Sequence, residues 1–224
     1  MQKMKLFLSA LTKFLAGLVL TGALLFLPAG SFSYTGGWIF IALLFIPMIF
    51  LGAVLIVKSP DLLKKRLDAK EKENTQKGVV ALSGLLFFVG FVVAGLDFRF
   101  GWSNVPAWLV IVASVILLAS YALYAEVMRE NAYLSRTIEV QEGQKVVSTG
   151  LYGTVRHPMY AVTIWLFLSI PLVLGSFWSL LCFLPYPIVI VVRILNEERI
   201  LTEGLEGYAD YKKKVKYRLI PFIW

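Results

Sequence analysis

Long apolar runs separated by short polar stretches dominate this sequence. Most runs have the length that a helix needs to cross about 30 Å of hydrocarbon. The first is long and lacks a clear cleavage site, so it predicts a membrane helix and not a signal peptide. The runs cover residues 6–27, 38–57, 79–96, 107–128, 159–174 and 177–195. This pattern predicts an all-α integral membrane protein with about six membrane-embedded helices.

The last two runs are short, and only the turn at Gly175 and Ser176 separates them. They therefore predict a tight C-terminal helical hairpin. The two outer ends of a short hairpin return to the same face of the membrane. We expect residues 156–157 and 197–198 to be neighbours in space, although about 40 residues separate them along the chain.

The polar stretch 58–77 predicts a short helix outside the membrane. Ser59 followed by Pro60 is a typical helix start, because proline is tolerated in the first turn. Leu62, Leu63 and Leu67 give this helix an apolar stripe. We expect the helix to lie on the membrane surface.

The tail, residues 196–224, predicts an amphipathic helix on the cytoplasmic side. Its apolar side chains recur every three or four residues, which is the helical period. They are Leu201, Leu205, Tyr208, Tyr211 and Val215. Pro221 is expected to end the helix.

Basic residues set the expected orientation. Twenty of the 22 Lys and Arg residues lie in the termini and in the loops on one side of the predicted segments, and only Lys13 and Arg99 do not. Such residues gather on the cytoplasmic side. With six crossings, both termini are expected there, in a cell inner membrane if the source is prokaryotic or in the endoplasmic reticulum if it is eukaryotic. This distribution explains the net charge of +8 without a nucleic-acid partner.

Two residue counts restrict the chemistry. Cys182 is the only cysteine, which excludes an intrachain disulfide and a thiolate metal cluster. His157 is the only histidine, which excludes a multi-histidine metal site. We expect no metal in the site. No GxGxxG stretch follows a predicted strand, which argues against a soluble Rossmann-type domain.

The concentrated polar positions follow the fourth apolar run. Each one alone has an ordinary explanation: Arg156 could anchor the chain at the headgroups, and Arg193 and Glu197 could form a helix-surface pair. Together they are harder to dismiss, since ionisable groups near membrane depth are functional candidates. They form one ordered set: Gly150-x-Tyr152-x-x-x-Arg156-His157-Pro158-x-Tyr160, Arg193-x-x-x-Glu197-Glu198-x-x-Leu201, Tyr208-x-x-Tyr211 and Pro221.

This set resembles the isoprenylcysteine carboxyl methyltransferase family, which shares a membrane superfamily with the phospholipid N-methyltransferases. The resemblance covers roughly residues 131–221. It divides the chain into N-terminal membrane helices (residues 1–128, with a cytoplasmic loop over 58–78) and a methyltransferase core (residues 129–224).

The resemblance implies S-adenosylmethionine as cofactor, bound on the cytoplasmic side, and a lipidic or lipid-modified acceptor. It places Asn131, Tyr152, His157 and Tyr160 in the cofactor site. Glu197 and Glu198 match the paired acids, one of which would hold the cofactor's amino group. Arg156 matches the basic residue beside the reacting centre. These two acids and Arg156 are the catalytic candidates, and all three are also cofactor-binding candidates.

Three alternatives stay open. A phospholipid amine could be the acceptor, in which case a Glu would matter as base. A membrane sterol reductase shares a related C-terminal core and uses NADPH, but its tail carries an Arg-Asp-Glu run and a later cysteine, which this sequence lacks. A non-enzymatic lipid-binding protein would retain the fold without a working site.

Overall fold

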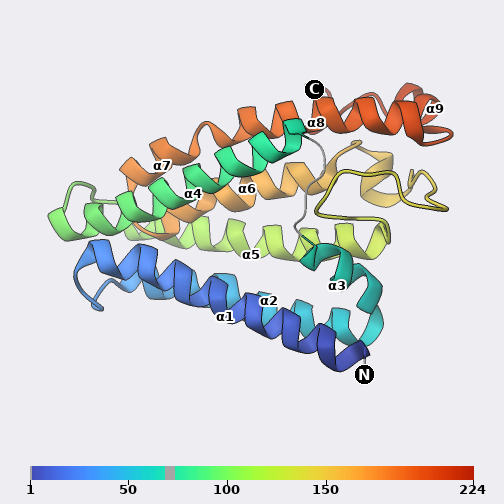
Figure 1. Ribbon diagram of the computed structural model, residues 1–224. Helices are drawn as coiled ribbons and strands as arrows, with labels where there is room; N and C mark the ends of the chain where they lie inside the picture. The colour runs from blue at the N-terminus through green and yellow to red at the C-terminus, as the bar shows by residue number, and fades with distance from the viewer. Residues whose placement is uncertain (1, 69–73) are drawn as a thin grey trace.

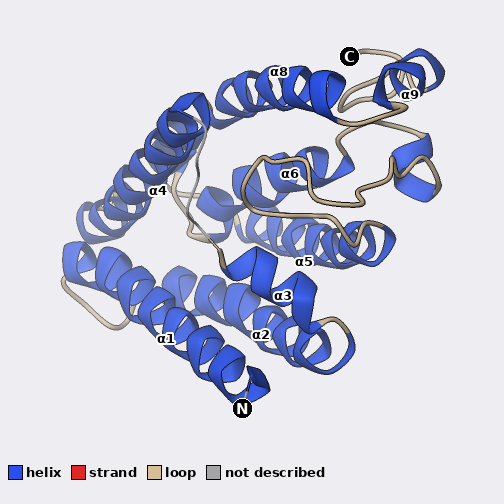
Figure 2. Cartoon of the chain, turned by 45° about the vertical axis from the view of Figure 1, so that its right-hand side comes forward, coloured by secondary structure: helices blue, strands red, loops and turns tan. Residues whose placement is uncertain are grey.

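The computed structural model describes residues 2–68 and 74–224, with side chains of the first helix from Met4 onward. The described residues form helices and loops and contain no β-strand. The long helices run roughly alongside one another (Figures 1 and 2). The helices are α1 (Gln2–Ala29), α2 (Thr35–Lys58), α3 (Pro60–Leu67), α4 (Asn74–Phe100), α5 (Ala107–Glu130), the 3₁₀ helix η1 (Gly150–Gly153), α6 (Pro158–Val173), α7 (Phe177–Phe183), α8 (Tyr186–Gly204) and α9 (Tyr208–Lys214).

Five segments of the described chain are long and apolar enough to cross a membrane. They are α1 from Met4, α2, α4, α5, and α7 together with α8. Helix α6 is apolar but shorter, with 16 residues. The predicted all-α membrane architecture is confirmed. Each of the first five predicted apolar segments corresponds to one helix, and the sixth corresponds to α7 and α8 together.

The sixth segment is a broken helix. Helix α7 ends at Phe183 and α8 begins at Tyr186, with Pro185 as its N-cap and Pro187 in its first turn. Proline has no backbone N–H to donate to the preceding turn, so the break follows from the sequence. The predicted hairpin is present: α6 and α7 are joined through Leu174, Gly175 and Ser176.

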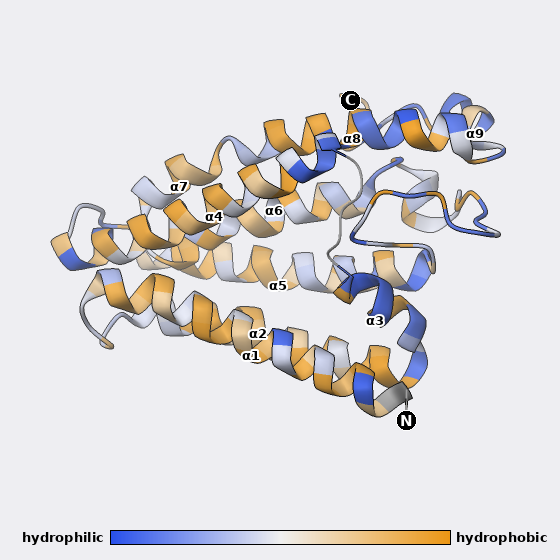
Figure 3. Ribbon diagram, viewed as in Figure 1, coloured by the Kyte–Doolittle hydropathy of each residue, from blue (hydrophilic) through white to orange (hydrophobic). Residues whose placement is uncertain are grey.

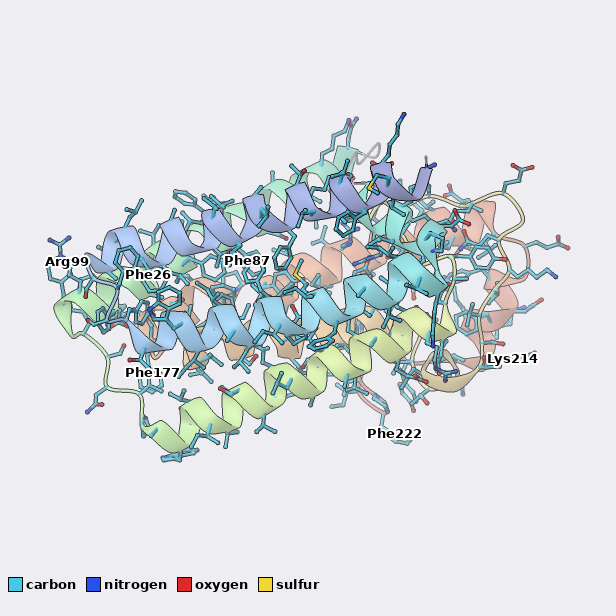
Figure 4. All side chains as sticks on the ribbon, turned by 90° about the horizontal axis from the view of Figure 1, so that it is seen from below. Phe26, Phe87, Arg99, Phe177, Lys214 and Phe222 are labelled. Atoms are coloured by element: carbon cyan, nitrogen blue, oxygen red, sulfur yellow. The ribbon has the colours of Figure 1, made fainter. Side chains whose placement is uncertain are left out.

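Aromatic side chains fill the centre of the bundle. The ring of Phe87 on α4, which is labelled in Figure 4, meets the rings of Phe167 on α6 and Phe183 on α7 edge to face, with centroids 4.7 and 5.0 Å apart. Gly90 lies one turn further along α4. A Cβ atom there would come within 2.2 Å of the Phe183 ring, so α4 and α7 pack this closely because residue 90 has no side chain.

A buried polar cluster secures the hairpin turn at the end opposite the chain termini. Asp97 on α4 is 2% exposed and accepts hydrogen bonds from the hydroxyls of Ser176 and Ser103. The phenol of Tyr34 donates to the Leu174 carbonyl oxygen at 2.7 Å. These bonds hold the turn against α2 and α4, and they thereby set where the inner ends of α6 and α8 lie.

The predicted surface helix begins where expected, but its apolar side chains pack against the protein and not only against the membrane surface. Helix α3 begins at Pro60 and ends at Leu67, but Leu62 and Leu63 are buried against the protein. Leu62 packs on Val127 and Met128 of α5. Of the predicted stretch, residues 69–73, including Lys70 and Lys72, lie outside the described residues, and 74–77 begin α4.

The tail departs from the single amphipathic helix that the periodicity predicted. Residues 196–204 continue α8, the chain turns at Gly207 with φ +81°, and a separate α9 ends at Lys214, well before Pro221. The periodic apolar residues nonetheless share one buried cluster. The helical period therefore correctly indicated which residues are buried together. The left-handed conformation of Gly207 breaks the helix, so that these residues belong to two helices.

Candidate functional site

A pocket is formed by segments that lie at the end of the bundle where both chain termini are found. Figure 1 shows the arrangement of these segments. The strongly hydrophilic segments of the chain gather at this same end (Figure 3). The pocket is lined by residues of the loop between α5 and η1, of η1, of the start of α6, of the end of α8 and of α9. Six of the seven predicted site residues line it: Asn131, Tyr152, Arg156, His157, Tyr160 and Glu197.

Glu198 connects the two ends of the hairpin. Its carboxylate, 3% exposed as a residue, accepts from Arg156 Nε at 2.6 Å and from Arg218 Nε at 3.0 Å, and lies 3.2 Å from His157 Nε2. The predicted proximity of residues 156–157 and 197–198 is therefore confirmed. Glu198 itself is not among the residues that line the pocket.

Arg156 is fixed on both sides of its guanidinium. Besides Glu198, it donates through Nη1 to the carbonyl oxygens of Val215 and Lys216, at 2.7 and 2.8 Å. The backbone N–H of Arg156 donates to the Tyr217 carbonyl oxygen, and the backbone N–H of His157 donates to the Arg218 carbonyl oxygen. These bonds explain why the tail folds back over the start of α6. The Nη2 atom of Arg156 takes part in none of these hydrogen bonds.

Glu197 occupies a different environment from its neighbour. It is half-buried, lines the pocket and accepts a hydrogen bond from the Tyr160 hydroxyl at 2.5 Å. Arg193 Nε donates to the same hydroxyl at 2.8 Å. Tyr160 thus stands between Arg193 and Glu197. Among the described residues, only one oxygen of the Glu197 carboxylate is hydrogen-bonded.

Arg193 holds several elements together around Tyr160. Its Nη1 donates to the Gln76 side chain of α4 at 3.0 Å, and its Nη2 donates to the Arg136 carbonyl oxygen at 2.7 Å. Gln76 is fully buried. Helix α4 and the pocket loop are therefore connected to the Tyr160–Glu197 pair, a connection that the sequence did not indicate.

Asn131 and Tyr152 form the opposite part of the wall. Asn131 Nδ2 donates to the Tyr152 hydroxyl at 3.0 Å, and the Tyr211 hydroxyl donates to the Tyr152 carbonyl oxygen at 2.7 Å. Burial raises the pKa of the Tyr152 phenol above its ordinary value, so this hydroxyl stays protonated. Tyr152 therefore remains a neutral donor and acceptor at physiological pH.

The turn that presents Tyr152 depends on Glu130. The Leu151 backbone N–H donates to the Glu130 carboxylate, with the nearer oxygen at 2.9 Å. Gly150 has φ +54°, and a Cβ atom there would fall 1.7 Å from a Glu130 oxygen. A side chain at residue 150 would therefore strain the left-handed backbone and displace the Glu130 carboxylate.

Sequence reasoning missed the pocket loop and the role of one tyrosine. Thr137, Ile138, Val146 and Val147 of the loop line the pocket, and no motif pointed to them. Tyr208 belongs to the predicted apolar stripe and to the ordered motif set, but it was not among the predicted site residues. Its buried hydroxyl is without a hydrogen-bond partner among the described residues.

The environment of Tyr208 keeps its phenol protonated. Burial, followed by the nearby carboxylates of Glu198 and Glu197, raises its pKa above the ordinary value. A buried hydroxyl without a partner is costly. A ligand acceptor in the pocket would satisfy it.

Comparison with known proteins agrees with the sequence resemblance. Residues 102–206 match the family model described as phospholipid methyltransferase. This match covers slightly less than half of the chain and includes most of the segment in which the sequence resemblance was found. The matched region carries all seven predicted site residues and ends before Tyr208 and α9.

Two curated relatives extend the comparison. The chain is 26% identical over 167 residues to the Bacillus subtilis (strain 168) protein YpbQ, which is described as uncharacterized; the match covers 74% of this chain and 96% of YpbQ. It is 29% identical over 99 residues to the mouse Delta(14)-sterol reductase TM7SF2, covering 39% of this chain. The match spans about a fifth of the sterol reductase, 22% of its length.

Proposed function

We propose that this chain is an integral-membrane methyltransferase that takes its methyl group from S-adenosylmethionine and transfers it to a lipidic or lipid-modified acceptor. The observation that carries the proposal is the chemistry of the pocket. It combines a half-buried carboxylate, Glu197, with a buried hydroxyl that has no partner among the described residues, Tyr208. Glu197 lies within the segment that matches the phospholipid methyltransferase model, and Tyr208 lies directly after it.

The residues present fit the cofactor's functional groups. An ammonium group requires a carboxylate, and Glu197 offers an oxygen that is not engaged by the described residues. An acceptor on the cofactor would satisfy the Tyr208 hydroxyl. An adenine ring requires apolar or aromatic cover, which Ile138, Val146 and Leu201 supply along the wall.

The two acids then have different tasks. Glu197 is the cofactor's partner, while Glu198 is a positioning residue that keeps Arg156 and His157 in place. Arg156 lines the pocket with one terminal nitrogen outside its bonds to Glu198 and the tail. That nitrogen is the candidate to orient a carboxylate of donor or acceptor.

The bound cofactor would supply an electrophilic methyl group, and the protein's contribution is alignment of donor and acceptor. A carboxylate acceptor is already ionised at neutral pH, with a reference pKa of about 4, and needs no base. An amine acceptor must first lose its proton to a base. The isoprenylcysteine-like carboxyl acceptor is our first choice, and a phospholipid amine is the alternative.

The site is proposed to face the cytoplasm. Both termini and the segments that line the pocket lie at one end of the bundle (Figure 1). Most of the basic residues belong to the loops and termini at this end. The preference of basic loops for the cytoplasmic side supports this orientation.

Calorimetric titration of the purified protein tests the proposal. We expect saturable binding of S-adenosylmethionine and of its demethylated product, and we expect the Glu197→Gln variant to bind both more weakly. Mass spectrometry of the purified protein for retained cofactor provides an independent measurement. Absence of binding in both assays, with a folded protein, would refute the proposal.

The similarity to a sterol reductase over 99 residues favours a second candidate, an NADPH-dependent reductase. The sequence has Glu197 and Glu198 where the reductase pattern has Arg-Asp-Glu, and Leu201 where it has a cysteine. Titration with NADPH in the same buffer distinguishes the two. Binding of NADPH without binding of S-adenosylmethionine would select the reductase.

A further inference from the structure

Arg66 of α3 stands at the edge of the pocket. Its Nη1 donates to the Ser135 carbonyl oxygen at 3.1 Å and lies 3.9 Å from Met159 Sδ, and both of these residues line the pocket. Its Nη2 donates to the hydroxyl of Tyr124 on α5. The guanidinium is thus half-buried where α3, α5 and α6 meet the pocket loop.

The charge of Arg66 is not compensated in the described part of the chain. Arg156 and Arg218 pair with Glu198, and Arg129 pairs with Glu126. Arg66 contacts neutral oxygens, a thioether and the Tyr124 ring, 5.5 Å from the centroid, and no described carboxylate lies within 4 Å. A partly desolvated cation without a counter-ion is unfavourable. It therefore favours an anionic partner beyond the groups that the structure describes.

A second cation from the same helix points to this edge. Lys65 Nζ donates to the Ala132 carbonyl oxygen at 3.3 Å and lies 5.6 Å from the centre of the Tyr133 ring. Tyr133 also lines the pocket. Helix α3 follows directly on the membrane-length helix α2, so both cations lie near the depth of lipid headgroups.

We propose that Arg66 binds an oxyanion in the headgroup of the methyl acceptor, either a phosphate ester or a carboxylate. The proposal rests on the proposed function, because it takes the molecule at this edge to be the acceptor. The planar fork of arginine suits both oxyanions, and Nε of Arg66 takes part in none of the bonds described above. Arg66 would select amphiphiles with an anionic headgroup over neutral ones.

The test uses three amphiphiles with equal chains and the full chain in an uncharged maltoside detergent. Decyl phosphate, decanoate and decanol are compared by native mass spectrometry. We expect at least one oxyanion to bind roughly tenfold or more tightly than decanol. Which oxyanion binds better identifies the source as a phosphate ester or a carboxylate.

The variants assign this preference to one residue. Arg66→Gln should remove the preference, and Arg66→Lys should retain part of it. Lys64→Gln, an exposed position on the same helix with the same charge change, should retain all of it. Equal binding of all three amphiphiles by the wild type, or an undiminished preference in Arg66→Gln, would overturn the inference.

Cofactor titration on the same samples separates this inference from the proposed function. Arg66→Gln should bind S-adenosylmethionine as the wild type does, since Arg66 is outside the set that would contact the cofactor. A wild type that binds no cofactor would refute the proposed function alone, and the headgroup preference would still be measured. If Arg66→Gln does not fold, the wild-type preference and the Arg66→Lys variant decide the outcome.

Discussion

Arg156 Nε and Glu198 Oε1 lie 2.6 Å apart in a buried ion pair, although 42 positions separate the two residues. The pair joins the loop before α6 to α8. The same carboxylate also receives Arg218 from the tail. The position of Arg156, a catalytic candidate, therefore depends on the ion-pair cluster that Glu198 forms with Arg156 and Arg218.

The paired acids should respond differently to the same substitution. Glu197→Gln should weaken binding of S-adenosylmethionine by roughly 1.5–3 kcal/mol, the range for a hydrogen bond to a charge, with little change in stability. Glu198→Gln should instead destabilise the protein by about 3–5 kcal/mol, because it leaves Arg156 and Arg218 without their counter-ion. Calorimetric titration and thermal unfolding measure the two effects. Unchanged cofactor affinity in Glu197→Gln would remove its assigned role.

Tyr208→Phe should weaken cofactor binding without loss of stability. The hydroxyl has no partner among the described residues, so its removal costs no described internal hydrogen bond. We expect a loss of about 0.5–1.5 kcal/mol in binding, the usual net value of one hydrogen bond.

Tyr211→Phe is the matched control for Tyr208→Phe. It removes the hydrogen bond to the Tyr152 carbonyl oxygen and should lower stability by about 1 kcal/mol. If Tyr208→Phe binds cofactor as tightly as the wild type, the hydroxyl does not face the ligand.

Arg156→Lys should lower turnover by at least about tenfold, roughly 1.4 kcal/mol of transition-state stabilisation. Lysine offers a point charge and cannot reproduce the separate bonds to Glu198 and to the two tail carbonyls. Some loss of stability is therefore also expected. The measurement is transfer of labelled methyl groups to a membrane lipid extract.

Arg218→Gln controls for damage to the ion-pair cluster. Arg218 contacts Glu198 but does not line the pocket. Its substitution should lower stability and leave most of the turnover intact. Full activity of Arg156→Lys would contradict the proposed role of Arg156.

The orientation in the membrane can be read by labelling single cysteines in a Cys182→Ser background. Lys213→Cys, exposed on α9, should react only from the cytoplasmic side. Phe32→Cys, 75% exposed between α1 and α2, should react only from the opposite side. Impermeant reagents on sealed vesicles give the measurement. Reversed labelling would place the proposed site on the wrong face of the membrane.

Gly90→Ala should destabilise the bundle by about 1–3 kcal/mol, the usual cost of overpacking. The added Cβ would fall within 2.2 Å of the Phe183 ring. Gly84→Ala on the same helix meets nothing within 4 Å and should be neutral or slightly stabilising. Melting temperatures in detergent compare the two. Equal melting temperatures would show that α4 and α7 can separate without cost.

The sequence alone determined the helical segments and the neighbourhood of the site. Runs of apolar residues predict membrane helices because hydrocarbon offers no partner for backbone polar groups. The short link at Gly175 and Ser176 predicts a hairpin, and a hairpin brings residues 156–157 and 197–198 to the same face of the membrane. The proximity of these residues could therefore be inferred from the sequence. These inferences depend on local composition and chain length, which a sequence displays directly.

Only the tertiary structure separated Glu197 from Glu198. Adjacent residues on a helix point roughly 100° apart, so one carboxylate meets Tyr160 and the pocket while the other meets Arg156 and Arg218. Which side faces which depends on how α8 rotates against α6 and the tail, and no local pattern records that rotation. The burial of Leu62, the break at Gly207 and the position of Arg66 beside Met159 were likewise decided by packing between segments far apart in the chain.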